Sequence, residues 1–441
     1  METVLLFILG VLVVVIGLAV SIALHEVGHL VPAKKFGVKV TQYMIGFGPT
    51  LFSRKRGETE YGVKAIPLGG YISMIGMFPP IKSGGKVRNA STGFFNTMVQ
   101  DARDVSAEGV GDDEHRAFYR LPIYKRIIIM LGGPAMNLLI AVVLFAVLLM
   151  GFGTAQVSTT VGSVSACVVP ATSTSQTCGP TDAPAPGAAA GIMPGDKLIS
   201  IQGNPVTSWA QSTDIIRDSA GVPLSFVVLR NGLETPLTIT PLLTERYALN
   251  EAGQIAKDAN GQNITQNVGF VGIGAAQELV PQPVTSVLPF VGENIGGVVH
   301  IIANLPARLV DVANAAFGSG PRDPNGPISV VGIGRVAGEI TSIDMPVQSK
   351  VASLLGLLAS LNVALFVINL VPLMPLDGGH VAGALWDALR RGFARLFRRP
   401  KPAPFDTAKL MPLTFGVVIL LGGMSALLIY ADIVKPISLF G

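Results

Sequence analysis

The stretch Ala23-Leu24-His25-Glu26-Val27-Gly28-His29 decides the interpretation of this chain, because a His-Glu-x-x-His pattern directly follows an apolar run. That run, Val4 to Leu24, is 21 residues long and carries no charged side chain. On a helix, His25 and His29 lie one turn apart on the same face, so both imidazoles can reach one Zn²⁺ ion. Glu26 lies just off that face and can take a proton from water. Such groups are costly inside a membrane span, so they predict a functional site there.

The composition indicates a membrane protein. Of the 441 residues, 49% are hydrophobic and only 14% are charged, with a mean hydropathy of +0.55. Soluble domains usually carry about 25% charged residues. Uncharged runs long enough to cross roughly 30 Å of hydrocarbon are Val4–Leu24, Ile127–Phe152, Val351–Leu376 and Leu410–Ala431. We therefore predict a polytopic α-helical membrane protein with four transmembrane helices.

The distribution of basic residues predicts the orientation. Residues 31–126 hold 15 Lys and Arg against 8 Asp and Glu, and residues 381–409 hold 7 against 2. Residues 153–350 hold 9 basic against 14 acidic side chains. Because cytoplasmic loops are enriched in Lys and Arg, the first two segments should be cytoplasmic and the central region and both termini external. This topology accounts for the net charge of +4, so nucleic-acid binding is not expected.

A second group of reactive residues ends the third run, in Asn369-Leu370-Val371-Pro372-Leu373-Met374-Pro375-Leu376-Asp377-Gly378-Gly379-His380. The two prolines should break the helix, so Asp377 is expected on irregular backbone at membrane depth. Such backbone persists only where protein or trapped water satisfies its polar groups. A catalytic zinc takes three protein ligands and leaves one position open, and the first motif supplies only two. Asp377 is the predicted third ligand.

On these motifs the chain resembles the site-2 proteases, a family of intramembrane zinc metalloproteases, in the bacterial form with one PDZ domain. His25, Glu26 and His29 match the family's H-E-x-x-H, and Asn369, Pro372, Pro375, Leu376, Asp377 and Gly378 match its Asn-x-x-Pro and Leu-Asp-Gly element. The resemblance covers nearly the whole chain. It implies one Zn²⁺ per chain held by His25, His29 and Asp377. Glu26 would be the general base, and Asn369 would help to stabilise the developing oxyanion.

Two inserted segments complete the predicted fold. Val38–Met77 alternates β-prone runs with Gly/Pro turns and is expected to form a cytoplasmic, membrane-associated β-sheet. Its edge could hold an unwound substrate as an added strand, or the sheet could only seal the site. Residues 153–280, with the element from Ala188 to Val206, resemble an extracytoplasmic PDZ domain. That domain could bind peptides or exclude substrates with large outer domains. Within it, Thr244–Gln266 is expected to be a loop.

Some smaller features leave alternatives open. Cys167 and Cys178 fall in the external region and could form a disulfide or remain free thiols. Gly132-Gly133-Pro134-Ala135-Met136-Asn137 resembles the family's G-P-x-x-N element, which favours close helix packing with a polar contact from Asn137. The element 326–334 could re-enter the membrane or pack against the third span. His115, His300 and His380 are not expected to bind the metal.

The predicted organisation follows from these segments. Its parts are residues 1–30 (first transmembrane helix), 31–125 (cytoplasmic loop with β-sheet), 126–152 (second helix), 153–280 (PDZ domain), 281–345 (membrane-surface helices and linker), 346–380 (third helix), 381–409 (basic cytoplasmic loop), 410–432 (fourth helix) and 433–441 (external tail). The protein is expected in the bacterial plasma membrane, with its active site toward the cytoplasm.

The resemblance implies regulated intramembrane proteolysis. Substrates would be single-span membrane proteins such as anti-sigma factors, already cut outside by a site-1-type protease. A non-catalytic PDZ scaffold is the alternative, and a metal transporter is a second rival that would need more than one polar span. The second and fourth runs carry no Asp, Glu, His, Lys or Arg, which disfavours transport. Fe²⁺ or Co²⁺ would suit the same ligands chemically, but zinc is the expected metal.

Overall fold

The computed structural model describes residues 2–77, 111–400, 402, 405 and 410–437, apart from gaps at 174–176, 180–181, 249–254, 259–261, 319–321 and 324–325. The centre of the predicted cytoplasmic loop, Lys401, Lys409 and the end of the predicted tail lie outside the described residues. The chain divides into two compact units, one made of residues 1–151 and 283–441 and the other of residues 152–282. Each is described by itself.

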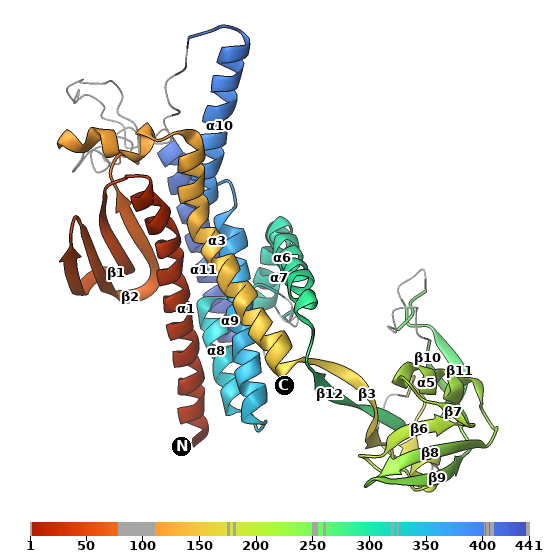
Figure 1. Cartoon of the computed structure of the whole chain (residues 1–441). Helices are drawn as coiled ribbons and strands as arrows, with labels where there is room; N and C mark the ends of the chain where they lie inside the picture. The colour runs from red at the N-terminus through yellow and green to blue at the C-terminus, as the bar shows by residue number, and fades with distance from the viewer. Residues whose placement is uncertain are drawn as a thin grey trace. The chain divides into compact units, whose positions relative to one another are not determined.

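Five helical segments in the described part of the chain are long and apolar enough to cross a membrane. They are α1 (Glu2–Lys35), α3 (Ile123–Val147) with the π-turn η3 (Leu148–Phe152), η4 (Val284–Ser286) with α6 (Val287–Ala303), α9 (Val347–Asn369) and α11 (Met411–Val434) (Figure 1). Four of them coincide with the predicted spans. α6 falls in the segment predicted to lie on the membrane surface. Leu5 and Leu420 are 67% and 68% exposed, as expected of helices whose apolar faces meet lipid.

Glycines set the close packing of the first unit. α1 crosses α3 at Gly28 and Gly132, and it crosses α8 (Val330–Ser342) at Gly10. A β-carbon on Gly10 would lie 2.3 Å from the carbonyl oxygen of Ala337, so the two backbones touch. The small-residue element 326–334 therefore leads into a helix that packs mainly on α1, with fewer contacts to α9. α7 (Leu305–Phe317) packs against α11.

The segment Val38–Met77 forms a curled sheet of two long strands, β1 (Val40–Arg56) and β2 (Thr59–Met74) (Figure 1). The strands bend, so Tyr43 stands opposite both Tyr61 and Ile72. Gly46 has φ +91, which side chains rarely adopt, and it lies close against the backbone of β2 at Ile66. The Tyr43 hydroxyl donates a 2.8 Å hydrogen bond to the carbonyl of Ala23 and so ties the sheet to α1.

Two short 3₁₀ turns, η1 (Gly111–Arg116) and η2 (Phe118–Arg120), lead into α3. Arg116 donates two hydrogen bonds to Glu58, at 2.7 and 2.8 Å, and Lys39 pairs with Asp113 at 2.7 Å. These cations lower the pKa of Glu58 and of Asp113 through hydrogen bonding and charge attraction. The acidic run beside His115 is thus a turn held by basic side chains.

The chain between α9 and α10 (Asp377–Leu396) corrects two predictions. Residues 370–376 are irregular, as the prolines require, but Asp377 is the first residue of a helix rather than part of that irregular segment. Gly378 permits this arrangement, because a β-carbon there would lie 2.4 Å from the carbonyls of Leu370 and Val371. Residues 381–396, expected to belong to a basic loop, are helical because Ala, Leu and Arg favour helix.

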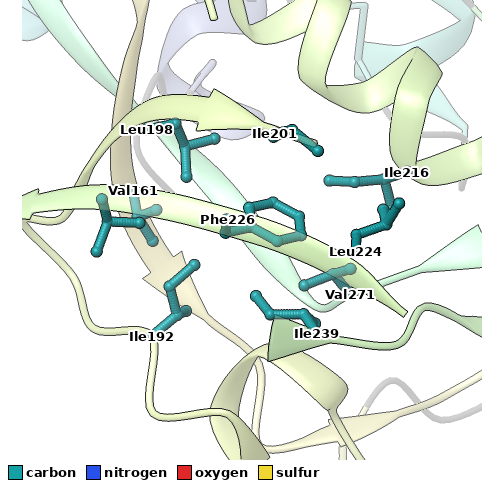
Figure 2. Close-up of a cluster of buried hydrophobic side chains, with 10 residues drawn as sticks. Val161, Ile192, Leu198, Ile201, Ile216, Leu224, Phe226, Ile239 and Val271 are labelled. Carbon is teal, nitrogen blue, oxygen red and sulfur yellow. The ribbon is translucent and has the colours of Figure 1, made fainter. Parts of the chain in front are cut away.

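The second unit is built on a sheet with strand order β12-β3-β6-β8-β9, and β7 pairs with β6. Its strands are β3 (Thr154–Val164), β4 (Cys167–Val168), β5 (Ala183–Pro184), β6 (Lys197–Ile201), β7 (Asn204–Pro205), β8 (Leu224–Arg230), β9 (Leu233–Ile239), β10 (Leu242–Tyr247), β11 (Thr265–Phe270) and β12 (Ile273–Val280); its helices are α4 (Pro186–Ala189) and α5 (Trp209–Asp218). Figure 2 shows Phe226 at the centre of the buried apolar cluster, which Val161, Leu198, Ile216 and Ile239 also form.

Two features of this unit go beyond the sequence prediction. β10 and β11 pair with each other, so the ends of the expected loop Thr244–Gln266 are strands. The Thr265 hydroxyl donates a 2.7 Å hydrogen bond to Glu245 across this pair. Such cross-strand contacts stabilise an extended backbone even where the side chains are polar. Cys167 and Cys178 form a disulfide.

Candidate metal centre

Two elements far apart in the sequence bring together three side chains of the kinds that can bind a metal ion. α1 carries His25 and His29 one turn apart, and α10 begins at Asp377. The two Nε2 atoms lie 3.1 Å apart, and Asp377 Oδ2 lies 3.3 Å from each of them. In the described part of the chain, these three residues form the one group of His, Cys, Asp and Glu with ligand atoms close enough to share a metal ion.

The spacing of these atoms fits zinc. In a tetrahedral site with bonds of about 2.0–2.1 Å, ligand atoms lie about 3.3 Å from one another. The observed separations of 3.1 and 3.3 Å agree with that value. Asp377 Oδ2 is buried, and no donor among the described residues is aligned to hydrogen-bond with it. A buried carboxylate oxygen without a donor is costly, and a cation between the three atoms would satisfy it.

α3 completes the surroundings of the two histidines. The ring atom Nδ1 of His29 lies 2.7 Å from the carbonyl oxygen of Ile129 and donates to it, which leaves Nε2 free to bind a metal. On the same helix, Asn137 Nδ2 lies 3.1 Å from Nδ1 of His25. Gly133 lies between these contacts, and a β-carbon there would come within 2.2 Å of His29 Nε2. Glycine at position 133 therefore leaves the space that the metal site needs.

Glu26 is buried against the β-sheet. Its side chain contacts Gly70 of β2, where a β-carbon would lie 2.9 Å from Glu26 Cγ and 3.1 Å from a methyl group of Ile22. The strand therefore runs directly past the carboxylate side chain. This contact brings extended backbone next to the residue predicted to act as base.

The other candidate residues lie elsewhere. Asn369 is the last residue of α9, and its predicted oxyanion role rests on no contact that the structure describes. His380 follows Asp377 by one turn of α10, and it is not part of the three-residue group. His300 is exposed near the end of α6 beside Asn304, and His115 lies in the η1 turn.

A polar contact from Asn137 was expected, but the sequence did not indicate that its partner is His25 or that Gly133 lies against both histidines. Gly133 and Asn137 belong to an element interpreted as a helix-packing motif. Only their distances to the imidazoles show that they also lie against the two histidines. Ile129 contributes a backbone carbonyl, which any amino acid could supply, so no residue pattern could have indicated it.

Comparison with known proteins agrees with this geometry. Residues 13–399 match the model of peptidase family M50. The chain is 34% identical to the zinc metalloprotease Rip1 of Mycobacterium tuberculosis strain H37Rv, over 99% of this chain and 100% of the relative. It is 31% identical to the Rip1 of Mycolicibacterium smegmatis, with the same coverage, and 29% identical to the metalloprotease MmpA of Caulobacter vibrioides, over 92% of this chain and 91% of the relative. The chain therefore belongs to peptidase family M50, the site-2 protease family.

Proposed function

We propose that this chain is an intramembrane zinc endopeptidase that cuts single-span membrane proteins within or next to their transmembrane helix. The observation that carries the proposal is the convergence of His25, His29 and Asp377 on one point, with Glu26 next to it. His25, Glu26 and His29 lie on α1, and Asp377 follows α9; both helices are apolar enough to cross a membrane. Membership in a peptidase family supports hydrolysis over the scaffold and transport alternatives.

The three clustered residues would hold Zn²⁺. When bound, zinc supplies Lewis acidity, which makes water nucleophilic near neutral pH and polarises a peptide carbonyl. The contact between Ile129 and His29 orients one imidazole for this task. Asp377 sits at the first position of α10, and Gly378 beside it lets this helix begin close against the carbonyls of Leu370 and Val371.

Glu26 would move the proton. Its carboxylate takes a proton from the attacking water and then delivers it to the nitrogen of the departing amine. Asn369 is proposed to donate a hydrogen bond to the developing oxyanion. Burial of Glu26 keeps bulk water from competing for the same proton transfer.

The free edge of β2 would hold the substrate as an extended strand. A transmembrane helix hides its carbonyls in internal hydrogen bonds, so it must unwind before hydrolysis. Among the residues that the structure describes, 70–74 of β2 pair with β1 along one edge only, and Gly70 at the start of this segment touches Glu26. An added strand there would pass the catalytic group. A purely sealing role for the sheet predicts instead that changes along this edge leave cleavage unaltered.

The second unit would act as an extracytoplasmic PDZ domain that meets substrates before cleavage. A cavity of about 210 Å³ lies between α5 and the segment from β11 to β12, lined among others by Trp209, Ile216, Arg246 and Phe270. This cavity supports peptide binding, whereas a size filter would not need it. Substrates would be anti-sigma-factor-like proteins first shortened by a site-1-type protease.

The proposed topology has four crossing helices in the bacterial plasma membrane, with the metal centre toward the cytoplasm. α6 is the least apolar of the five candidates, contains Pro289 and carries Glu293, which favours a place on the outer surface.

Cleavage of an epitope-tagged single-span substrate in liposomes, with zinc content measured in parallel, tests the proposal. Glu26→Gln should keep its zinc and lose at least about 100-fold in cleavage rate, because only the base is removed. His25→Ala and Asp377→Ala should lose both zinc and cleavage. His300→Ala, an exposed histidine outside the cluster, is the matched control and should match the wild type. Cleavage that persists in Glu26→Gln would remove the base assignment, and a wild type that binds substrates without cutting any would favour the scaffold.

A further inference from the structure

Asn137 contains a buried amide whose contacts are incomplete. The residue is 1% exposed, and its Nδ2 lies 3.1 Å from Nδ1 of His25. Its Oδ1 is also buried, and no donor among the described residues hydrogen-bonds to it. A buried acceptor without a donor destabilises the fold, so the amide is expected to find a donor nearby. The ring nitrogen that the amide contacts, Nδ1 of His25, is the candidate donor.

The tautomer of the His25 imidazole determines whether the oxygen or the nitrogen of the Asn137 amide must face Nδ1. To bind a metal through Nε2, the neutral imidazole must carry its proton on Nδ1. Nδ1–H is then a donor, and it cannot form a hydrogen bond with the amide NH₂ group, which is a donor as well. A half-turn of the amide exchanges its oxygen and nitrogen and places Oδ1 where Nδ1–H can donate to it.

We infer that Asn137 is a positioning residue: its Oδ1 accepts the Nδ1–H of His25 and holds this imidazole in the tautomer whose Nε2 binds zinc. One hydrogen bond thereby satisfies both the orphaned oxygen and the ring. The inference rests on the proposed zinc site and adds to it a residue outside the ligand set.

α3 then orients both ligand imidazoles. Ile129 and Asn137 lie eight residues apart, about two helical turns, so they share the face of α3 that meets α1. His29 donates to a backbone carbonyl, which no substitution removes. His25 depends on a side chain. The two ligands therefore differ in their sensitivity to mutation, and only the support of His25 can be removed without changing a ligand.

Zinc affinity of the full-length protein in detergent, measured by competition with a chromophoric chelator, tests this role. Asn137→Leu preserves approximate size but removes the acceptor, and affinity should fall about 10- to 100-fold. Asn137→Asp keeps an acceptor oxygen and should restore affinity to the wild-type level or above. Asn362→Leu is the matched control, because Asn362 is also 1% exposed in a helix of this unit and hydrogen-bonds to Ser21 instead of a ligand. The zinc affinity of the Asn362→Leu variant should be unchanged.

A second measurement detects the hydrogen bond directly in the wild type. The chain has only five histidines, so the ring protons of His25 can be assigned by NMR of the zinc-loaded wild type. Its Nδ1–H resonance should show a strong hydrogen bond and slow exchange with water, and both properties should disappear in Asn137→Leu. A fast-exchanging Nδ1–H in the wild type would overturn the inference, and so would equal losses of affinity in Asn137→Leu and Asn137→Asp, which would indicate packing alone. Absence of cleavage with normal zinc binding would contradict the proposed function and leave this inference standing.

Discussion

Gly28 of α1 and Gly132 of α3 meet backbone to backbone. A β-carbon on Gly132 would lie 2.0 Å from the carbonyl oxygen of Gly28, and one on Gly28 would lie 2.2 Å from the carbonyl of Gly132. This crossing is one residue from His29 on α1 and one residue from Gly133 on α3. The distance between the two helices at the metal site is therefore set by the absence of side chains.

Gly132→Ala should push α3 away from α1 and lower zinc affinity at least about 10-fold, because the histidine contacts made from α3 would move. Zinc competition on the full-length protein measures the change. Gly422→Ala is the control, because a β-carbon at Gly422 of α11 meets nothing within 4 Å. Equal affinities for the two variants would contradict the role of the crossing.

Gly70→Ala should slow cleavage with little change in zinc content, since the added methyl group would displace Glu26 and leave the ligands in place. A loss of about 10-fold or more in kcat is expected, because proton transfer requires the carboxylate at a defined position. Ala65→Val, which adds methyl groups to an exposed position of the same strand, should cleave normally. If Gly70→Ala loses zinc instead, the contact would support the metal site rather than the base.

The buried pair of Arg126 and Asp387 ties α3 to α10, with 2.9 Å between Nη2 and Oδ2. Asp387 also accepts a 2.6 Å hydrogen bond from the backbone of Phe405. Asp387→Ala leaves a buried arginine unpaired, which should cost about 3–5 kcal/mol of stability. It should also weaken zinc binding, since α10 begins with Asp377.

The matched control is Asp432→Ala. Asp432 pairs with the buried Arg322 and accepts a 2.6 Å hydrogen bond from the backbone of Ser329, where α8 begins. Its removal should destabilise the protein by a similar amount and leave zinc affinity unchanged. If both variants lose zinc equally, the effect is general unfolding.

The second unit should lose stability at low pH through Asp196. This buried carboxylate accepts two hydrogen bonds from Arg230, at 2.7 and 2.8 Å, and they lower its pKa below the ordinary value of 3.8. A lowered pKa in the folded state stabilises the fold above pH 3.8, and this stabilisation decreases as the pH falls below that value. Asp196→Asn should therefore destabilise the unit by about 1–3 kcal/mol at neutral pH and by less in acid.

Amide hydrogen exchange of residues 192–230 in the full-length protein, compared at pH 7 and near pH 3, measures this difference. Asp214→Asn changes an exposed aspartate of α5 and should leave exchange unaltered at both pH values. A destabilisation by Asp196→Asn that does not depend on pH would show that charge plays no part.

The sequence predicted which three side chains lie together, because two strong constraints act on them. Helical spacing places His25 and His29 on one face, and a catalytic zinc needs a third protein ligand, for which Asp377 after the two prolines was the predicted residue. It could not predict where α10 begins, because prolines end a helix without specifying the residue that starts the next one. Only the tight approach of Gly378 to the preceding carbonyls explains that Asp377 is helical.

Other differences have the same origin in tertiary contacts. The ends of the stretch from Thr244 to Gln266 are polar, and they form strands because Glu245 and Thr265 pair across β10 and β11. The α8 helix packs mainly on α1 because Gly10 admits it, and nothing in the residues 326–334 specifies that partner. α6 is another such case. Its length and composition alone would allow it to cross a membrane, because these properties measure how apolar a helix is and not which part of the protein or membrane surrounds it.

The distribution of the proposed ligands along the chain also determines when the site can form during biosynthesis. His25 and His29 leave the ribosome early, whereas Asp377 follows only after most of the polypeptide has been made. A chain that is still being translated holds two ligands and lacks the third. With these three residues as the ligands, membrane proteins inserted at the same time would meet an incomplete site, and proteolysis would begin only once synthesis has passed α10.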